Sequence, residues 1–416
     1  MISALSHRLQ SSGNKWYLSV LICVVIGACS PKITQTVKPL PKPVVETKPV
    51  KPVTPPVIAA PVVRNIALLL PFDLDKLDFS PSANSQNLNQ AALAADYYQG
   101  FKLALDSLTA KGYNYKLQVF DSRGEASEGH SLALNPKVRS SDLIVGPVFP
   151  EILKSFTATM GAYPKPIVSP LSPASPADYK DPNLITAMPP LAYHAVYIAK
   201  YITERIRPVK VFVLKSGYSE ENKFILPFTR SMDTLSKKGI TVISIVVSRG
   251  NLDMLIPQLS RSSENVFIVP ATDEPFLLVT LRSLEKLAQS YPVTLFGHPN
   301  WIKASFLQTE LLQHLKTHIT TSDRVDYKSA AITAFIRSYK KVYHIEPTEY
   351  AIKGFDEGYY FGNLISTNPN AFKRLDQNNY TGLLNDFNFK KSEGNGWINT
   401  HVRMLQYQNF DLKPIQ

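Results

Sequence analysis

The chain has 416 residues, of which 44% are hydrophobic, and a formal net charge of +12. This length is typical of two or three domains, and the hydrophobic content is sufficient for packed cores. The positive charge is dispersed: residues 30–63 hold five lysines and one glutamate, and no long run of Lys and Arg follows. The distribution therefore excludes the basic footprint of a nucleic-acid-binding protein.

Residues 1–29 are typical of a targeting segment. Arg8 and Lys15 precede an apolar stretch, residues 16–28, that is too short to span a bilayer comfortably. The stretch ends in Ile26-Gly27-Ala28-Cys29. This resembles the bacterial lipoprotein signal, which implies cleavage before Cys29 and a lipid on its thiol. An uncleaved apolar anchor with an incidental cysteine is the alternative.

The cysteines and the residue after Cys29 extend this interpretation. The other cysteine, Cys23, lies inside the apolar stretch, so the rest of the chain has no thiol for a disulfide, a nucleophile or a metal site. Ser30 stands where inner-membrane lipoproteins of this class often have Asp. We therefore expect a lipid-anchored protein of the cell envelope, at the outer membrane and facing the periplasm.

Residues 30–63 predict a linker. They contain nine prolines, which fix φ and remove backbone donors, so neither helix nor sheet is favoured. At about 3.1 Å per residue, a Pro-rich chain of this length reaches roughly 100 Å. Such a segment would tether a globular body to a membrane.

From Arg64 onward, short apolar runs alternate with helical patterns. The runs are β-branched and continuous, as in strands buried on both faces of a parallel sheet. The predicted strands of the first set are 66–70, 115–120, 143–146 and 166–169, with helices over 91–111 and 151–162. The second set has strands 210–216, 241–247, 265–271 and 293–297, with helices over 193–205, 221–238, 252–260 and 274–290. This order predicts two doubly wound α/β domains in tandem.

Several stretches occur in the order found in a known family. They are IALLLPF (66–72), VFDSRG (119–124), DLIVGPVFP (142–150), KPIVSPLSP (165–173), and a C-terminal pattern that includes Phe335, Tyr339, Pro347, Tyr350 and Asp356. This set resembles the type 1 periplasmic-binding-protein family, in its leucine/isoleucine/valine-binding branch. The resemblance implies two α/β lobes with a central cleft: lobe one at 64–188 plus 323–385, and lobe two at 189–322 plus 386–416.

The resemblance also carries two functional expectations. Most members clamp a small solute for transport or sensing, which predicts an amino-acid-like ligand and a permease partner. Some lipid-anchored members are similar to activators of peptidoglycan synthases, which predicts a cell-wall synthase as partner instead. Neither implies catalysis or a cofactor, and the chain has none of the common nucleophile, phosphate-loop or zinc-protease motifs.

Ligands of open α/β sheets sit beyond the carboxyl ends of the strands, so we take the candidate site from those positions. In lobe one these are Asp73, Asp121, Gly146, Ser169 and Ser172. Gly146 permits close backbone approach. The resemblance implies that Ser169 and Ser172 hold a ligand carboxylate; alternatively, Ser169 only caps a turn in a Pro-stiffened loop.

In lobe two the corresponding residues are Tyr218, Asp273, His298 and Trp301. The resemblance implies an aromatic wall and an acidic partner for an amine. Asp273 is equally suited to cap the next helix, which is the favoured interpretation. Trp301 lines the cleft or packs in the core.

Two further features are open. Residues 73–91 separate the first strand from its helix by more than a usual βα loop. The segment would be a lid, a partner contact or a disordered excursion. His314 and His318 stand four apart, which predicts one helical face. Since no carboxylate lies between them in the zinc-protease manner, we expect surface histidines and no metal site.

Overall fold

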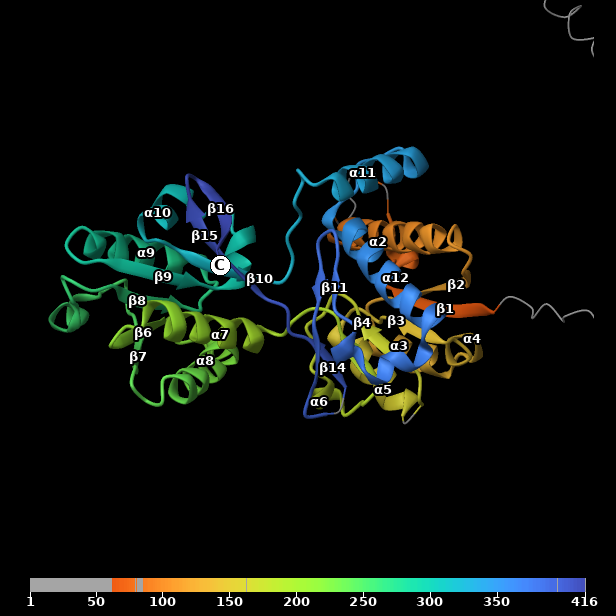
Figure 1. Ribbon diagram of the computed structural model, residues 1–416, viewed down its shortest axis with the longest axis horizontal. Coiled ribbons are helices and arrows are strands. Elements are labelled where there is room, and N and C mark those ends of the chain that lie inside the picture. Colours follow the sequence, from red (N-terminus) through yellow and green to blue (C-terminus); the bar gives the residue numbers. More distant parts are fainter. Residues whose placement is uncertain (1–61, 79, 81–84, 162, 395, 416) are drawn as a thin grey trace, which may run out of the picture. The chain divides into compact units, whose positions relative to one another are not determined.

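The computed structural model describes residues 62–415, apart from 79, 81–84, 162 and 395. The targeting segment, Cys29 and nearly all of the predicted linker therefore lie outside the described residues. Among the described residues, no helix is long and apolar enough to cross a membrane. The described part of the chain contains two seven-stranded sheets, each with helices packed against it (Figure 1). A two-stranded sheet of β11 (Tyr380–Thr381) and β12 (Asp386–Phe387) accompanies them.

Lobe one contains a sheet with the strand order β13-β14-β5-β4-β3-β1-β2. Its pairs are parallel except for β13 with β14. The strands are β1 (Val63–Leu70), β2 (Asn114–Asp121), β3 (Leu143–Val145), β4 (Ile167–Ser169), β5 (Leu184–Thr186), β13 (Phe389–Lys391) and β14 (Trp397–Asn399). The first four follow the predicted apolar runs, whereas β5 was not predicted. Strands buried on both faces, such as β3 and β4, need continuous apolar sequence.

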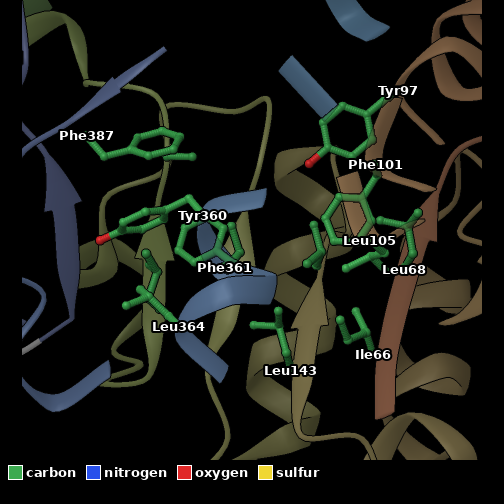
Figure 2. Close-up of a cluster of buried hydrophobic side chains, with 14 of the residues drawn as sticks. Ile66, Leu68, Tyr97, Phe101, Leu105, Leu143, Tyr360, Phe361, Leu364 and Phe387 are labelled. Carbon is green, nitrogen blue, oxygen red and sulfur yellow. The ribbon is translucent and has the colours of Figure 1, made fainter. Parts of the chain in front are cut away.

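Alternate residues of β1 face two different helical layers. Ile66 and Leu68 pack with α2 (Ser85–Thr109) and α12 (Glu349–Thr367), in the cluster drawn in Figure 2. Ala67 and Leu69 pack instead with α3 (Ala126–Leu134), α4 (Pro136–Arg139) and α5 (Pro150–Met160). α11 (Ala330–Tyr343) contributes to a separate cluster with α2 and α12. This is the two-layered covering of a doubly wound sheet.

The helices α2 and α12 approach each other closely at glycines. A Cβ added to Gly100 would lie 1.8 Å from the carbonyl oxygen of Ala351, and one added to Gly354 would lie 2.1 Å from that of Tyr97. Neither position therefore has room for a side chain. α2 also begins earlier than predicted, at Ser85, and a short 3-10 turn, Leu74–Lys76, precedes it.

Lobe two contains a sheet with the strand order β16-β15-β10-β9-β8-β6-β7. The strands are β6 (Lys210–Lys215), β7 (Thr241–Val246), β8 (Asn265–Val269), β9 (Val293–Gly297), β10 (His318–Thr321), β15 (Arg403–Gln408) and β16 (Asp411–Ile415). α7 (Leu191–Tyr201) and α8 (Asn222–Leu235) pack on one face of β6, and α9 (Glu274–Ala288) and α10 (Thr309–His314) on the other. The predicted helix over 252–260 is a 3-10 helix, Asp253–Gln258.

The chain passes between the lobes three times: after β5, after β10 and after β14. The first passage follows Thr186 and the second follows Thr321. The third differs from the boundary predicted after residue 385, because β13 and β14 extend the sheet of lobe one. The passage instead follows Asn399, whose side-chain amide donates to the Ala187 carbonyl in the first passage (2.9 Å).

The prediction that His314 and His318 share a helical face is wrong. α10 ends at His314, Lys316 has a positive φ of 47°, and His318 opens β10. The side chain of His318 is buried, and its ring stacks on Phe296 with 4.7 Å between centroids. A residue in the left-handed conformation ends the helical path, so the spacing of four has no helical meaning here.

Candidate functional site

A cavity of about 440 Å³ lies where the two lobes meet. Lobe two contributes residues of α7 and of the segment after β9, and lobe one contributes the first turns of α12. The first passage and the second passage, residues 321–325, complete the wall. Because the chain crosses between lobes here, relative movement of the lobes would change the shape of this cavity.

A buried ion pair lies in the wall of the cavity. The Lys353 ammonium of α12 is 2.5 Å from a carboxylate oxygen of Asp323 in the second passage, and the Lys353 side chain is only 5% exposed. Although burial alone would raise the pKa of Asp323, the Lys353 ammonium and the Thr321 hydroxyl hold it below its ordinary value. The pair thus joins lobe one to the passage through two ionised groups.

Two neutral histidines line the same cavity. His194 in α7 has its Nδ1 3.0 Å from the Thr320 hydroxyl, and His298 after β9 accepts a hydrogen bond at Nδ1 from the Asn300 amide (3.1 Å). Burial lowers the pKa of each to about 4. Both rings are therefore uncharged at neutral pH, and each brings polar nitrogen atoms without a net charge.

Three more charged side chains line the cavity. Lys303 lies 4.0 Å from the carboxylate of Glu349, and both are largely exposed. Arg324, half-buried, donates from Nη2 to the Leu412 carbonyl (3.3 Å). The cavity thus combines positive and negative groups from both lobes, and contacts of this kind orient small polar molecules in pockets.

Asp73 and Asp121 meet at the carboxyl ends of β1 and β2. The Asp121 carboxylate accepts hydrogen bonds from the backbone amides of Phe72, Asp73, Leu74 and Arg123, at 3.0–3.1 Å. Asp73 is buried with a φ of 48°, and its carboxylate accepts from the Gln90 amide. These bonds fix the loop after β1, and a ligand role for either carboxylate stays a prediction.

Gly146, Ser169 and Ser172 lie at the ends of β3 and β4. Gly146 has a φ of 95°, and a Cβ there would lie 2.1 Å from the Leu69 carbonyl oxygen, so the position requires glycine. The Ser169 hydroxyl is fully buried and donates to the Ser172 carbonyl (3.0 Å). Ser172 lines a second cavity of about 810 Å³ beside α7.

In lobe two, Tyr218, Asp273 and His298 come together. They line a further cavity of about 370 Å³ that shares His298 with the first. Tyr218 is 65% exposed. Asp273 accepts a hydrogen bond from the Phe276 amide (3.0 Å), which confirms the predicted N-cap of α9.

Trp301 is in the core of lobe two. It is 2% exposed, its Nε1 donates to the Ala271 carbonyl (2.8 Å), and its ring fills the space beside Gly297. Of the two roles considered for it, packing is the one it has in this structure. The residues beside it, Asn300 and Ile302, line the cavity instead.

Sequence reasoning assigned no site role to the charged groups of the second passage and of α12, and named Asp356 only as part of the family pattern. Lys353, Asp356 and Glu357 are all buried in a helix otherwise rich in aromatic residues and glycine. Asp356 accepts three backbone hydrogen bonds from residues 383–385, and burial raises its pKa to about 6. Three charges inside an apolar helical stretch were the available signal, because buried charges need partners.

The fold is that of type 1 periplasmic binding proteins. A putative branched-chain amino acid ABC transporter protein from Rhodospirillum rubrum superposes with a TM-score of 0.60 at 15% identity, over 85% of this chain and 100% of that one. An ABC transporter substrate-binding protein from Desulfitobacterium hafniense, solved in complex with Leu, gives 0.55 at 16% identity over the same shares.

A protein described differently has the same fold. The C-domain of LpoA from Haemophilus influenzae, a regulator of PBP1A, superposes with a TM-score of 0.57 at 13% identity, over 85% of this chain and 100% of that domain. No protein-family model matches the sequence, and no curated protein matches it either. At these identities the comparisons establish the fold, and function must be argued from the site.

Proposed function

We propose that this chain is a solute-binding protein that clamps a small polar ligand, amino-acid-like in size and charge, between its two lobes. The observation that carries the proposal is the cavity of about 440 Å³ at the junction of the lobes, with charged side chains of both signs. Ligand pockets commonly measure about 300–1,000 Å³. Two solved proteins of this fold belong to ABC transporters, and one holds Leu, which supports this ligand class.

The clamp depends on a ligand that contacts the two lobes better in one arrangement of the lobes than in another. A ligand that touches both lobes stabilises the arrangement in which the lobes enclose it, in proportion to its preference for that arrangement. The three passages are the elements that absorb such movement. The proposal includes no catalytic step, cofactor or metal; a permease is the partner that such a protein would deliver its ligand to.

Thermal unfolding tests this function. The purified protein is heated with each of the standard amino acids, short peptides and muropeptides at millimolar concentration. A ligand at a concentration about a hundredfold above its Kd stabilises the folded state by about 2.7 kcal/mol, which raises the melting temperature by several degrees. We expect such a rise with at least one compound. No shift with any of them would overturn the proposal.

A second candidate is a non-catalytic regulator of a peptidoglycan synthase. Asp121, Ser169 and Asp273 already bond within the chain, which leaves fewer strand-end groups for a solute. The LpoA domain is a regulator of PBP1A with this fold. This function predicts co-purification of a synthase with the protein from the envelope, and an unaltered cell wall in a deletion strain would count against it.

Anchoring through a lipid on Cys29, at the outer membrane, completes the proposal. Its support is the sequence of residues 26–30. Metabolic labelling with a radioactive fatty acid should mark the wild-type protein and leave the Cys29→Ala variant unlabelled. Equal labelling of both would contradict the anchor.

A further inference from the structure

The hydroxyl that the resemblance assigns to a ligand carboxylate is already committed. Ser169 is fully buried, and its hydroxyl donates to the Ser172 carbonyl at 3.0 Å. A hydroxyl has a single hydrogen to donate. Ser169 would therefore have to break this bond to bind a carboxylate, which leaves a buried carbonyl without its partner.

Arg324, which lines the cavity, has several N–H groups without a partner among the described residues. Its guanidinium carries five N–H groups, and its one side-chain bond within the described residues runs from Nη2 to the Leu412 carbonyl. No carboxylate among the described residues forms an ion pair with it, whereas Lys353 is paired with Asp323 and Lys303 lies near Glu349. Arg324 is thus the unmatched cation of a cavity lined by three cations and two carboxylates.

His298 adds a neutral donor to the same cavity. Because its Nδ1 accepts the hydrogen bond of the Asn300 amide, the hydrogen of the neutral ring is on Nε2. The ring lines the cavity and its neighbour of about 370 Å³. An Arg guanidinium and an N–H donor in a pocket both suit an acceptor with two oxygens.

We infer that the ligand binds through a carboxylate, which Arg324 of the second passage holds and to which His298 donates from Nε2, in place of the Ser169 loop. The inference rests on the proposed solute-binding function and narrows it to carboxylic acids, amino acids included. It also places the contact that selects carboxylates on the second passage, which joins the lobes. Arg324 would then take part both in ligand binding and in the movement of the lobes.

Calorimetric titration of the full-length protein tests this. The probes are the standard amino acids and simple mono- and dicarboxylates, each paired with its amide, which differs only in the carboxylate. The variants are Arg324→Gln, Arg324→Lys, Ser169→Ala and, as a charge-matched control, Arg337→Gln, whose exposed side chain is on α11. Thermal unfolding of each variant without ligand checks that it is folded.

We expect a carboxylate to bind and its amide to bind at least tenfold more weakly. Arg324→Gln should weaken carboxylate binding by about 10- to 100-fold, the value of a charge-assisted hydrogen bond, with Arg324→Lys intermediate and the other two variants near wild type. Equal binding of acid and amide, or a loss confined to Ser169→Ala, overturns this inference and leaves the solute-binding function standing. Absence of binding by every probe overturns this inference, and it overturns the solute-binding function as well when the peptides and muropeptides of the thermal test also produce no shift.

Discussion

The ion pair between Lys353 and Asp323 gives the sharpest energetic prediction. Lys353→Met removes the ammonium and leaves the Asp323 carboxylate, whose side chain is 24% exposed, without its partner at 2.5 Å. Breaking a fully buried pair costs about 3–5 kcal/mol, and the partial exposure of Asp323 reduces this to roughly 2–3 kcal/mol. Asp323→Asn alone leaves the buried ammonium unpaired and should cost at least as much.

A double-mutant cycle in urea measures the coupling. The combination of Lys353→Met with Asp323→Asn removes both charges, so its loss of unfolding free energy should be smaller than the sum of the two single losses by about 2 kcal/mol. Additive losses would mean that the two groups do not interact in solution. That result would refute the placement of an ionised pair in the cavity wall.

Three further changes test the packing and the buried polar groups. Gly354→Ala places a Cβ 2.1 Å from the Tyr97 carbonyl oxygen and should lower the unfolding free energy by about 3 kcal/mol. The control Gly124→Ala, whose added Cβ has its nearest neighbour at 3.7 Å, should change it by less than about 1 kcal/mol. Similar losses in the two variants would contradict the close contact between α2 and α12. Asp356→Ala leaves three backbone amides without their acceptor and should cost about 3 kcal/mol in urea unfolding; a loss below about 1 kcal/mol would show that water replaces the carboxylate. Burial lowers the pKa of His318 to about 4, so the unfolded state binds a proton before the folded state does, and the unfolding free energy falls as pH drops from about 6.5 to 4. His318→Phe should lessen this fall by up to about 3 kcal/mol at pH 4. Parallel curves of unfolding free energy against pH for the two proteins would contradict this.

Local sequence pattern was sufficient for most of the buried parallel strands, although β5 and β10 were not predicted. β1 and β8, for example, are continuous apolar runs because helices cover both of their faces. β13 and β14 were missed as parts of lobe one, since short strands near a sheet edge carry charged residues such as Lys390 and Lys391. Their sheet is set by long-range pairing of β14 with β5, which no local pattern encodes.

The candidate site was predicted less completely than the fold. Of the predicted strand-end residues, His298 lines the cavity at the junction of the lobes, and the others do not. Sequence spacing gives no account of hydrogen-bond commitments, so the bond from Ser169 to Ser172 and the four amides on Asp121 were not foreseen. Arg324 and Lys353 were missed because neither follows a predicted strand. Arg324 lies in the second passage between the lobes, and Lys353 lies in α12; both line the cavity.

The most direct test of the solute-binding account is mass spectrometry of small molecules released from the protein, purified from residue 30 onward under mild conditions. The account predicts one dominant carboxylate-bearing compound, released on denaturation in an amount close to that of the protein and depleted in the Arg324→Gln variant. Protein that releases no small molecule, and that takes up none from a cell extract, would contradict it.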